Sequence, residues 1–315
     1  MKQSLSVVLS VHNEESVIEP ALESAKPIAD EIIVVDNEST DKTVQIAKKY
    51  TKNIHEHKNT PELLNKPKNF GFSKAAGDWI LSLDADERVS PELAKEISGI
   101  LHSSFDIQNS PVGYWIPRQN LVFGKWLQHG IWYPDYQLRL FRKEKGQFPA
   151  IHNHEFLAVE GRTEKLKGHL IHKSYSGITE YIDKFNHTYT DNEAENFLKS
   201  GKKITWIDAI RWPLSDFITN FFARRSYQDG LHGLVLSLLQ AFYALEVFAK
   251  VWERQGFWEY NSKDLAKGVK AEFQAKSKEF SWWYAKELIP WFMKPEVPDL
   301  SASIPQTITC QKVIR

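Results

Sequence analysis

The sequence is poor in cysteine and carries no excess of charge. Its 315 residues include one cysteine, Cys310, which excludes a disulfide framework and any zinc site built from several cysteines. The 40 lysines and arginines balance the 40 aspartates and glutamates. No overall positive field therefore draws the chain to polyanions, and we expect no nucleic-acid partner.

Glycine-rich phosphate loops and long apolar runs are missing as well. No Gly-x-Gly-x-x-Gly follows the first predicted strand and no Gly-x-x-x-x-Gly-Lys-Ser/Thr occurs, which argues against dinucleotide oxidoreductases and P-loop NTPases. The nearest approach to a membrane span, residues 230–245, contains His232 and Gln240 and ends before Glu246. We interpret it as a buried or interfacial helix. The N-terminal residues predict a strand rather than a signal peptide.

The first ninety residues alternate strand and helix patterns, which is typical of a parallel α/β sheet covered by helices. Strands are predicted at residues 5–11, 31–35, 53–57 and 79–83, and helices at residues 68–76 and from Ser90-Pro91 onward. In the last helix, Leu93, Ile97 and Leu101 share one face.

The residue composition and pattern then change at two points. Aromatic-rich strands and loops follow residue 111, and long helical patterns follow residue 184. We therefore expect three regions: a catalytic domain at 1–185 (nucleotide-binding half 1–110, acceptor half 111–185), a helical region at 186–295, and a tail at 296–315.

Polar or acidic residues follow three of the predicted strands. They are His12 and Asn13, Asp36, and the pair Asp84 and Asp86. Ligands of open α/β sheets bind beyond the carboxyl ends of the strands. A divalent cation held there by carboxylates neutralises a diphosphate without a glycine loop, and Mg²⁺ and Mn²⁺ prefer such oxygen ligands.

Each of these signals has a structural alternative. Asp86 and Glu87 are also consistent with acidic residues that precede a helix N-terminus, where negative charge is favourable. Asp36, taken alone, fits an ordinary turn residue equally well.

In the order of its motifs, the sequence resembles the inverting GT-A glycosyltransferases of family 2. The resemblance runs through SVVLSVHNEE, EIIVVDNESTDKT, PKNFGFSKAAGDW and WILSLDADERVSPEL. It is strongest to the lipopolysaccharide core β-glucosyltransferase subgroup, through RQNLVFGKWLQHGIWYPDYQLRLFRK, His154-Glu155, QDGLHG and FAKVWE. The chain departs from the family pattern at Asn37 and Glu38, where Asp and Gly are common, and it lacks the usual Glu-Asp pair of the acceptor half.

The resemblance implies a GT-A fold with a C-terminal helical extension. It also implies a nucleotide-diphospho-sugar donor, such as UDP-glucose, a glycan or glycolipid acceptor, and Mg²⁺ or Mn²⁺ as cofactor. Asp36 is then the uracil contact, Asp84 the ribose contact and Asp86 the metal ligand. The other donor-binding candidates are His12, Asn13, Glu14, Lys68, Asn69 and Arg139.

Inverting transfer requires a general base that deprotonates the acceptor hydroxyl. Glu155 and Asp135 are the candidates, and we favour Glu155, whose alternative is a structural ion pair. His172 is expected to approach the diphosphate or to complete the metal coordination. Arg139 and Arg142 fit either a phosphate contact or a pair with a local acid.

Other groups in the acceptor half have two interpretations. Trp126, Trp132 and Tyr133 form either a sugar-stacking platform or core. A zinc site built from His152, His154, His169 and His172 is disfavoured. Strand alternation would place His152 and His154 on the face opposite Glu155, and no His-Glu-x-x-His occurs.

The helical region combines apolar and aromatic residues with Arg224 and Arg225, which is typical of a helix at a membrane interface or of one packed on another domain. The lipid-linked acceptors of the resembling subgroup favour a cytoplasmic protein attached peripherally to the inner face of the cell membrane. Two other functions stay open. One is transfer to a polyprenyl phosphate, and the other is a catalytically silent scaffold of a polysaccharide assembly.

Overall fold

The computed structural model describes residues 2–60, 63, 65–103, 110–150 and 156–287. As far as the chain is described, it forms two compact units. Unit 1 consists of Met1–Leu121 and Tyr133–Ser174, and unit 2 of Val122–Trp132 and Tyr175–Arg315. The domain boundaries expected at residues 185 and 295 remain predictions.

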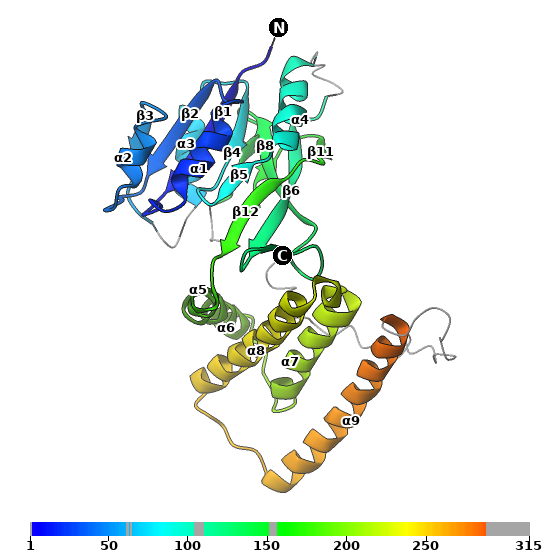
Figure 1. The fold of residues 1–315 in the computed structure, drawn as a ribbon. Helices are drawn as coiled ribbons and strands as arrows, with labels where there is room; N and C mark the ends of the chain where they lie inside the picture. The colour runs from blue at the N-terminus through cyan, green and yellow to red at the C-terminus, as the bar shows by residue number, and fades with distance from the viewer. Residues whose placement is uncertain (1, 61–62, 64, 104–109, 151–155, 288–315) are drawn as a thin grey trace. The chain divides into compact units, whose positions relative to one another are not determined.

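Unit 1 is built on a mixed sheet with the strand order β3-β2-β1-β4-β8-β6-β12-β5 (Figure 1). Its strands are β1 (Leu5–Val11), β2 (Glu31–Asp36), β3 (Asn53–Glu56), β4 (Trp79–Ser82), β5 (Glu87–Val89), β6 (Gly113–Val122), β8 (Asp135–Arg142), β11 (Thr163–Lys165) and β12 (Leu170–Tyr175). β3, β2, β1 and β4 are parallel, whereas β8 runs antiparallel to β4 and β6, and β12 antiparallel to β5. The predicted α/β sheet with its four N-terminal strands is confirmed.

Alternating residues of the strands supply two cores, one on each face of the sheet. Four helices belong to unit 1: α1 (Ile18–Ala25), α2 (Thr43–Ala47), α3 (Asn65–Lys74) and α4 (Pro91–His102). Val7 and Leu9 pack with α1 and α4, while Val8 packs with Phe72 of α3. A Cβ at Gly71 would lie 2.5 Å from Val8 Cγ1, so this glycine lets α3 lie close against the sheet.

Helix α4 begins and packs as its sequence indicates. The Ser90 hydroxyl accepts a hydrogen bond from the Leu93 N–H at 3.2 Å, and Pro91 occupies the first turn. Leu93, Ile97 and Leu101 are all buried. The sequence analysis missed β5, a three-residue strand directly before this cap.

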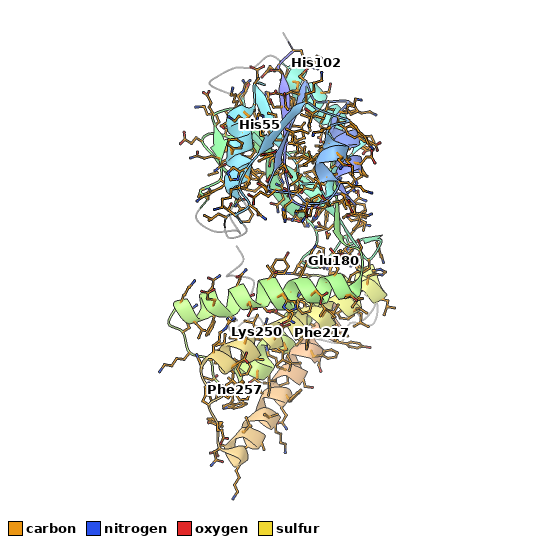
Figure 2. All side chains as sticks on the ribbon, turned by 90° about the vertical axis from the view of Figure 1, so that its left-hand side faces the viewer. His55, His102, Glu180, Phe217, Lys250 and Phe257 are labelled. Atoms are coloured by element: carbon orange, nitrogen blue, oxygen red, sulfur yellow. The ribbon has the colours of Figure 1, made fainter. Side chains whose placement is uncertain are left out.

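Unit 2 is helical. Its helices are α5 (Ile178–Lys184), α6 (Thr190–Lys199), α7 (Asp208–Ile218), α8 (Leu231–Arg254) and α9 (Ser262–Glu287), with π-helical turns at Phe185–Tyr189 and Thr219–Ala223 and a 3₁₀ turn at Ser226–Asp229. In unit 1, β9 (Gly146–Gln147) and β10 (Ala158–Val159) form a separate two-stranded antiparallel sheet, whereas the short β7 (Lys125–Trp126) pairs with β6. On α8, Lys250 Nζ lies 3.1 Å from Glu246 Oε1 and 3.5 Å from Asp191 Oδ2. Figure 2 labels Lys250 on this helix.

By length and composition, α8 is long and apolar enough to cross a membrane, and it is the one such helix within the described residues. The mean hydropathy of its most apolar part is 1.6, and 44% of that part is buried inside the structure. The sequence-based interpretation ended this run before Glu246, whereas the helix continues to Arg254. A helix packed in a bundle has the same properties, so the finding is weak evidence for a span.

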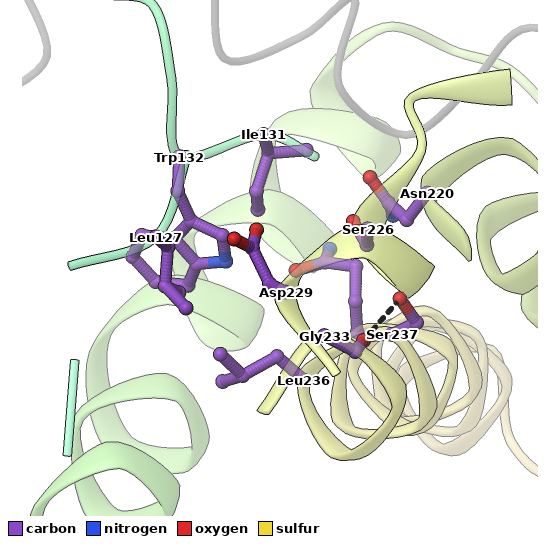
Figure 3. Close-up of a pocket in the computed structure, with 10 residues that line it drawn as sticks. Leu127, Ile131, Trp132, Asn220, Ser226, Asp229, Gly233, Leu236 and Ser237 are labelled. Atoms are coloured by element: carbon purple, nitrogen blue, oxygen red, sulfur yellow. Dashed lines mark hydrogen bonds between the residues drawn. The ribbon is translucent and has the colours of Figure 1, made fainter. Parts of the chain in front are cut away.

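The QDGLHG stretch, residues 228–233, connects two segments of unit 2 through Asp229, and we call this contact the clasp. The Asp229 carboxylate accepts the backbone N–H groups of Gln128 at 3.1 Å and His129 at 3.0 Å, which ties the segment 122–132 to the start of α8. A cavity of about 10 Å³ lies behind it, with room for one water molecule but not for a sugar (Figure 3). The clasp is therefore structural.

Replacing Gly233 with alanine is expected to destabilise unit 2 by about 3 kcal/mol, because overpacking against rigid backbone has costs of this order. The added Cβ would lie 1.7 Å from the Ser226 carbonyl oxygen, which is backbone and does not swing aside. Gly177 is the matched control: its φ is −157° and no atom lies within 4 Å of an added Cβ. Gly177→Ala should change the stability by less than about 0.5 kcal/mol. Calorimetry of both variants that shows equal unfolding temperatures would contradict this account of the clasp.

Candidate active site

The loops after β1 and β2 are bonded to each other. The β1–β2 register places Val11 opposite Asp36, so both strands end at the same edge of the sheet. His12 Nδ1 lies 2.7 Å from the Asn37 carbonyl oxygen, and Asn13 Oδ1 accepts the Thr40 N–H at 2.8 Å. These bonds fix the sequence-predicted donor residues of this edge on one surface.

Two residues at this edge have local structural partners. The Glu14 N–H donates to the Thr43 hydroxyl at 2.7 Å. Asp36 is 6% exposed, and its carboxylate accepts the Ser39 N–H at 3.2 Å. Asp36 thus closes the turn after β2, and its contact with a base stays a prediction.

Asp84 is partly buried, with 28% of its side chain exposed, and it belongs to a network of charged side chains that includes the buried Arg139 and Glu87. Its carboxylate accepts from Lys68 Nζ at 2.6 Å and from the Arg139 guanidinium, which also bonds to Glu87 at 3.0 Å. Burial opposes ionisation of Asp84, but Arg139 and Lys68 outweigh it and hold the pKa of this carboxyl far below its usual range. Asp84 is therefore ionised at neutral pH.

The same network decides between the two interpretations of Arg139. Its side chain is 7% exposed and Glu87 is fully buried, so this arginine pairs with local acids. Arg142 contacts the Trp79 ring with its guanidinium 4.9 Å from the ring centroid, at the other end of β4. Both arginines therefore have local partners in the structure, and a phosphate contact of Arg139 stays a prediction.

Asn69 is held by backbone. Its amide nitrogen donates to the Phe148 carbonyl at 2.8 Å, and its amide oxygen accepts the Phe148 N–H at 2.9 Å. This two-point contact fixes the loop after β9 on α3. Lys68 also stacks on Phe148, with Nζ 5.6 Å from the ring centroid.

Asp86 and His172 meet at this edge although 86 positions separate them. Strand β12 pairs with β5 so that His172 lies opposite Glu87, and the Lys173 N–H donates to the Asp86 carbonyl at 3.0 Å. His172 Nε2 lies 3.2 Å from Asp86 Oδ2. The Asp86 side chain is 37% exposed and that of His172 15%.

This pair fits a divalent cation that a diphosphate also binds. Among the described residues no group of three His, Cys, Asp or Glu side chains has the arrangement of a metal site. Two protein ligands are nevertheless what Mg²⁺ or Mn²⁺ requires when phosphate oxygens and waters fill the other positions. One carboxylate oxygen and one imidazole nitrogen converge here, which matches that donor set.

Asp135 is bound by three neighbouring side chains. Its Oδ2 lies 2.6 Å from Arg118 Nη2 and accepts from Asn120 Nδ2 at 3.0 Å, while Oδ1 accepts from Gln137 at 2.8 Å. Burial raises its pKa, but Arg118 and these hydrogen bonds prevail and lower the pKa below its ordinary value. Glu155, the favoured base, lies outside the described residues, as do His152 and His154.

The aromatic residues of the acceptor half divide between the two units. Trp132 packs edge-on against Tyr175 in the core of unit 2, with ring centroids 6.1 Å apart. Tyr133 belongs to unit 1, where it stacks on His169 at 5.9 Å. For Trp132 the structure supports the core interpretation.

Sequence reasoning missed Glu87, Arg118 and Asn120. Arg118 and Asn120 are two positions apart on β6, so they share one face of the strand, and that alternation was the available signal. Glu87 gave none, because its burial depends on Arg139, 52 positions away.

The chain is similar to known glycosyltransferases. The model of glycosyl transferase family 2 matches residues 6–158. An uncharacterized glycosyltransferase of Rickettsia typhi, RT0209, is 31% identical over 80% of this chain and 87% of its own. The lipopolysaccharide core biosynthesis glycosyltransferase LpsC of Rhizobium meliloti is 27% identical over 80% and 93%. The crystal structure of Staphylococcus aureus TarS 1–349 is 17% identical over 82% of this chain and 93% of its own, with a TM-score of 0.41.

The mixed sheet with flanking helices is the GT-A arrangement, and helices α5 to α9 form the expected C-terminal extension. With a relative 31% identical over four-fifths of its length, the chain belongs to glycosyltransferase family 2.

Proposed function

We propose that this glycosyltransferase is an inverting, metal-dependent enzyme. It transfers a sugar from a UDP-sugar, with UDP-glucose the expected donor, to a hydroxyl of a glycan or glycolipid of the cell envelope. The observation that carries the proposal is the convergence of Asp86 and His172, 3.2 Å apart, beside the ionised Asp84 at the carboxyl ends of the strands. The similarity to LpsC supports the assignment to lipopolysaccharide core biosynthesis.

Asp86 and His172 would hold the cation. When bound, Mg²⁺ or Mn²⁺ supplies Lewis-acid stabilisation of the departing diphosphate. The positive charges of Lys68 and Arg139 stabilise the ionised form of Asp84. Its remaining carboxylate lone pairs accept hydrogen bonds from ribose hydroxyls. Asp36 accepts from the base at the end of the neighbouring strand.

The proposed general base is Glu155. A base needs an oxygen with a free lone pair and a pKa that is not depressed. Asp135 accepts from Arg118, Asn120 and Gln137 and has a lowered pKa, which makes it a weak base. We assign Asp135 a positioning role instead.

These two roles predict different kinetic effects. Glu155→Gln should lower kcat by about 10² to 10⁴, the usual contribution of a base, and leave the Mn²⁺ concentration at half-maximal activity unchanged. Asp135→Asn should instead raise that Mn²⁺ concentration and recover most of kcat at saturating metal. A steady-state Mn²⁺ titration of both variants separates the roles, and the opposite pattern would make Asp135 the base.

A thermal-shift screen of nucleotide sugars with and without Mn²⁺ tests the donor proposal. Stabilisation follows RT ln(1 + [L]/Kd), so the true donor should stand out at equal ligand concentration, and only with metal present. A catalytically silent scaffold would show no Mn²⁺-dependent stabilisation by any of them.

The proposed location is the cytoplasmic face of the cell membrane, with peripheral attachment. Leu238, Phe242 and Leu245 of α8 are exposed and lie at helical spacing on one face, which supports contact with a lipid surface. Sedimentation with phospholipid vesicles, compared between the wild type and Phe242→Glu, tests this contact.

A further inference from the structure

We propose that Asn120 is a positioning residue that fixes the imidazole tautomer of His172 and so turns the lone pair of Nε2 toward Asp86. The proposal rests on the metal-dependent function above. It adds that metal affinity depends on a buried amide that touches neither metal nor substrate.

The orientation of the Asn120 amide follows from Asp135. Arg118 lies 2.6 Å from Asp135 Oδ2, so this carboxylate is ionised and only accepts hydrogen bonds. The Asn120 group 3.0 Å from the same oxygen must therefore be the NH₂ group. The amide oxygen then points the other way, toward His172, and an exchange of the two amide atoms would place two acceptors against each other.

The tautomer of His172 follows from the amide. Asn120 Oδ1 lies 2.7 Å from His172 Nδ1, and an amide oxygen only accepts, so the hydrogen belongs to Nδ1. In the neutral ring Nε2 then carries the lone pair, and it faces Asp86 Oδ2 at 3.2 Å. Two electron-rich atoms at this distance are the arrangement that a shared cation stabilises.

Burial protects this chain of bonds from water. Asn120 is 3% exposed and Ser174 is 7% exposed. The Ser174 hydroxyl lies 3.0 Å from His172 Nδ1 and 3.2 Å from Asn120 Oδ1, so it accepts from the ring and donates to the amide. The groups come from β8, β6 and β12, adjacent strands of one sheet, which holds them in register.

The hydrogen bonds run in a defined order, from Arg118 to Asp135, then to Asn120 and finally to His172. Metal-ligating histidines generally have their second ring nitrogen bound in this way, and loss of the partner typically lowers metal affinity by about 10- to 100-fold. The ordinary partner is a carboxylate or a backbone carbonyl. Here the side-chain amide of Asn120, itself oriented by the ion pair between Arg118 and Asp135, takes that place.

The first test needs no metal and no variant. Long-range ¹H–¹⁵N spectra of the metal-free protein labelled with ¹⁵N-histidine, recorded at about pH 8 where histidine is neutral, report which ring nitrogen carries the hydrogen. The resonance is assigned by its loss in His172→Asn. We expect the Nδ1–H form in the wild type and a shift toward the Nε2–H form, which free histidine favours, in Asn120→Ala.

The second test measures Mn²⁺ binding in the presence of UDP by the loss of the free-ion EPR signal. Asn120→Ala should weaken binding by about 10- to 100-fold. Gln137→Ala is the matched control, because Gln137 bonds to the other oxygen of Asp135 and, within the described residues, makes no hydrogen bond to His172. It should bind Mn²⁺ within about twofold of the wild type. Circular dichroism verifies that both variants fold.

The outcomes separate this inference from the proposed function. If the wild type binds Mn²⁺ with UDP, but His172 carries its hydrogen on Nε2 and Asn120→Ala binds normally, Asn120 has no such role and the metal-dependent function stands. If the wild type binds no Mn²⁺, the metal proposal fails, and the spectra of the metal-free protein still decide the tautomer.

Discussion

Asp86→Asn is expected to lower turnover by about 10³-fold, measured as UDP released from the donor at saturating Mn²⁺. A loss of this size corresponds to about 4 kcal/mol of transition-state stabilisation, within the several kcal/mol that a Lewis-acid cation supplies. Asp86 Oδ2 lies 3.2 Å from His172 Nε2, and the Asp86 side chain is 37% exposed. An amide at this position keeps the shape of the side chain and removes the charge that attracts the cation.

Asp78 provides the matched control. It lies just before β4, at the opposite end of the strand from Asp86, and accepts the N–H of Ser4 at 2.8 Å and its hydroxyl at 2.9 Å. Asp78→Asn removes the same charge at the other end of β4 and should leave turnover within about threefold of the wild type. Equal activities of the two variants would remove the basis for the metal site.

Arg139→Met is expected to destabilise unit 1 by about 3 to 5 kcal/mol, the usual cost of removing one partner of a buried ion pair. Glu87 is fully buried, and its bond to Arg139 measures 3.0 Å. Without Arg139 the nearest remaining cation is Arg118, 3.7 Å from the same Glu87 oxygen, which places the expected loss at the lower end of that range. Urea unfolding followed by the fluorescence of Trp79 and its neighbours measures the loss.

Arg162→Met makes the same substitution at an exposed pair of unit 1. The Arg162 and Glu164 side chains are 63% and 44% exposed, and surface pairs contribute about 0 to 1 kcal/mol. A difference of less than 1 kcal/mol between Arg139→Met and Arg162→Met would show that the buried network does not stabilise the fold.

The pH dependence of stability follows from the same network. The pKa of Asp84 is lower in the folded than in the unfolded chain, so its pairing contributes stability above the unfolded value of about 3.9. That contribution is lost progressively as the pH falls below this value. Arg139→Met should therefore lose less stability on acidification than the wild type.

Local sequence determines much of unit 1. The four N-terminal strands end at polar residues, and parallel strands bring those ends to one edge, so the placement of Asp36 and Asp86 at this edge was predictable from the pattern. The Ser90 cap and the apolar face of α4 were equally predictable, because both depend on neighbours within one or two turns.

The rest depends on pairs that are distant in sequence. Strand β5 is three residues long and exists because β12 pairs with it. The partner of Arg139 was left open between a phosphate and an acid, and burial beside Glu87 decided it. Asn120 shares a strand face with Arg118, but strand alternation alone does not show that its amide lies between Asp135 and His172.

Electron spin-echo envelope modulation of Mn²⁺ bound with UDP tests the central claim most directly, because it detects a nitrogen coordinated to the ion. The wild type should show ¹⁴N modulation that disappears in His172→Ala and when the protein carries ¹⁵N-histidine. Bound Mn²⁺ without histidine nitrogen modulation in the wild type, or modulation that survives in His172→Ala, would contradict a site formed by Asp86 and His172.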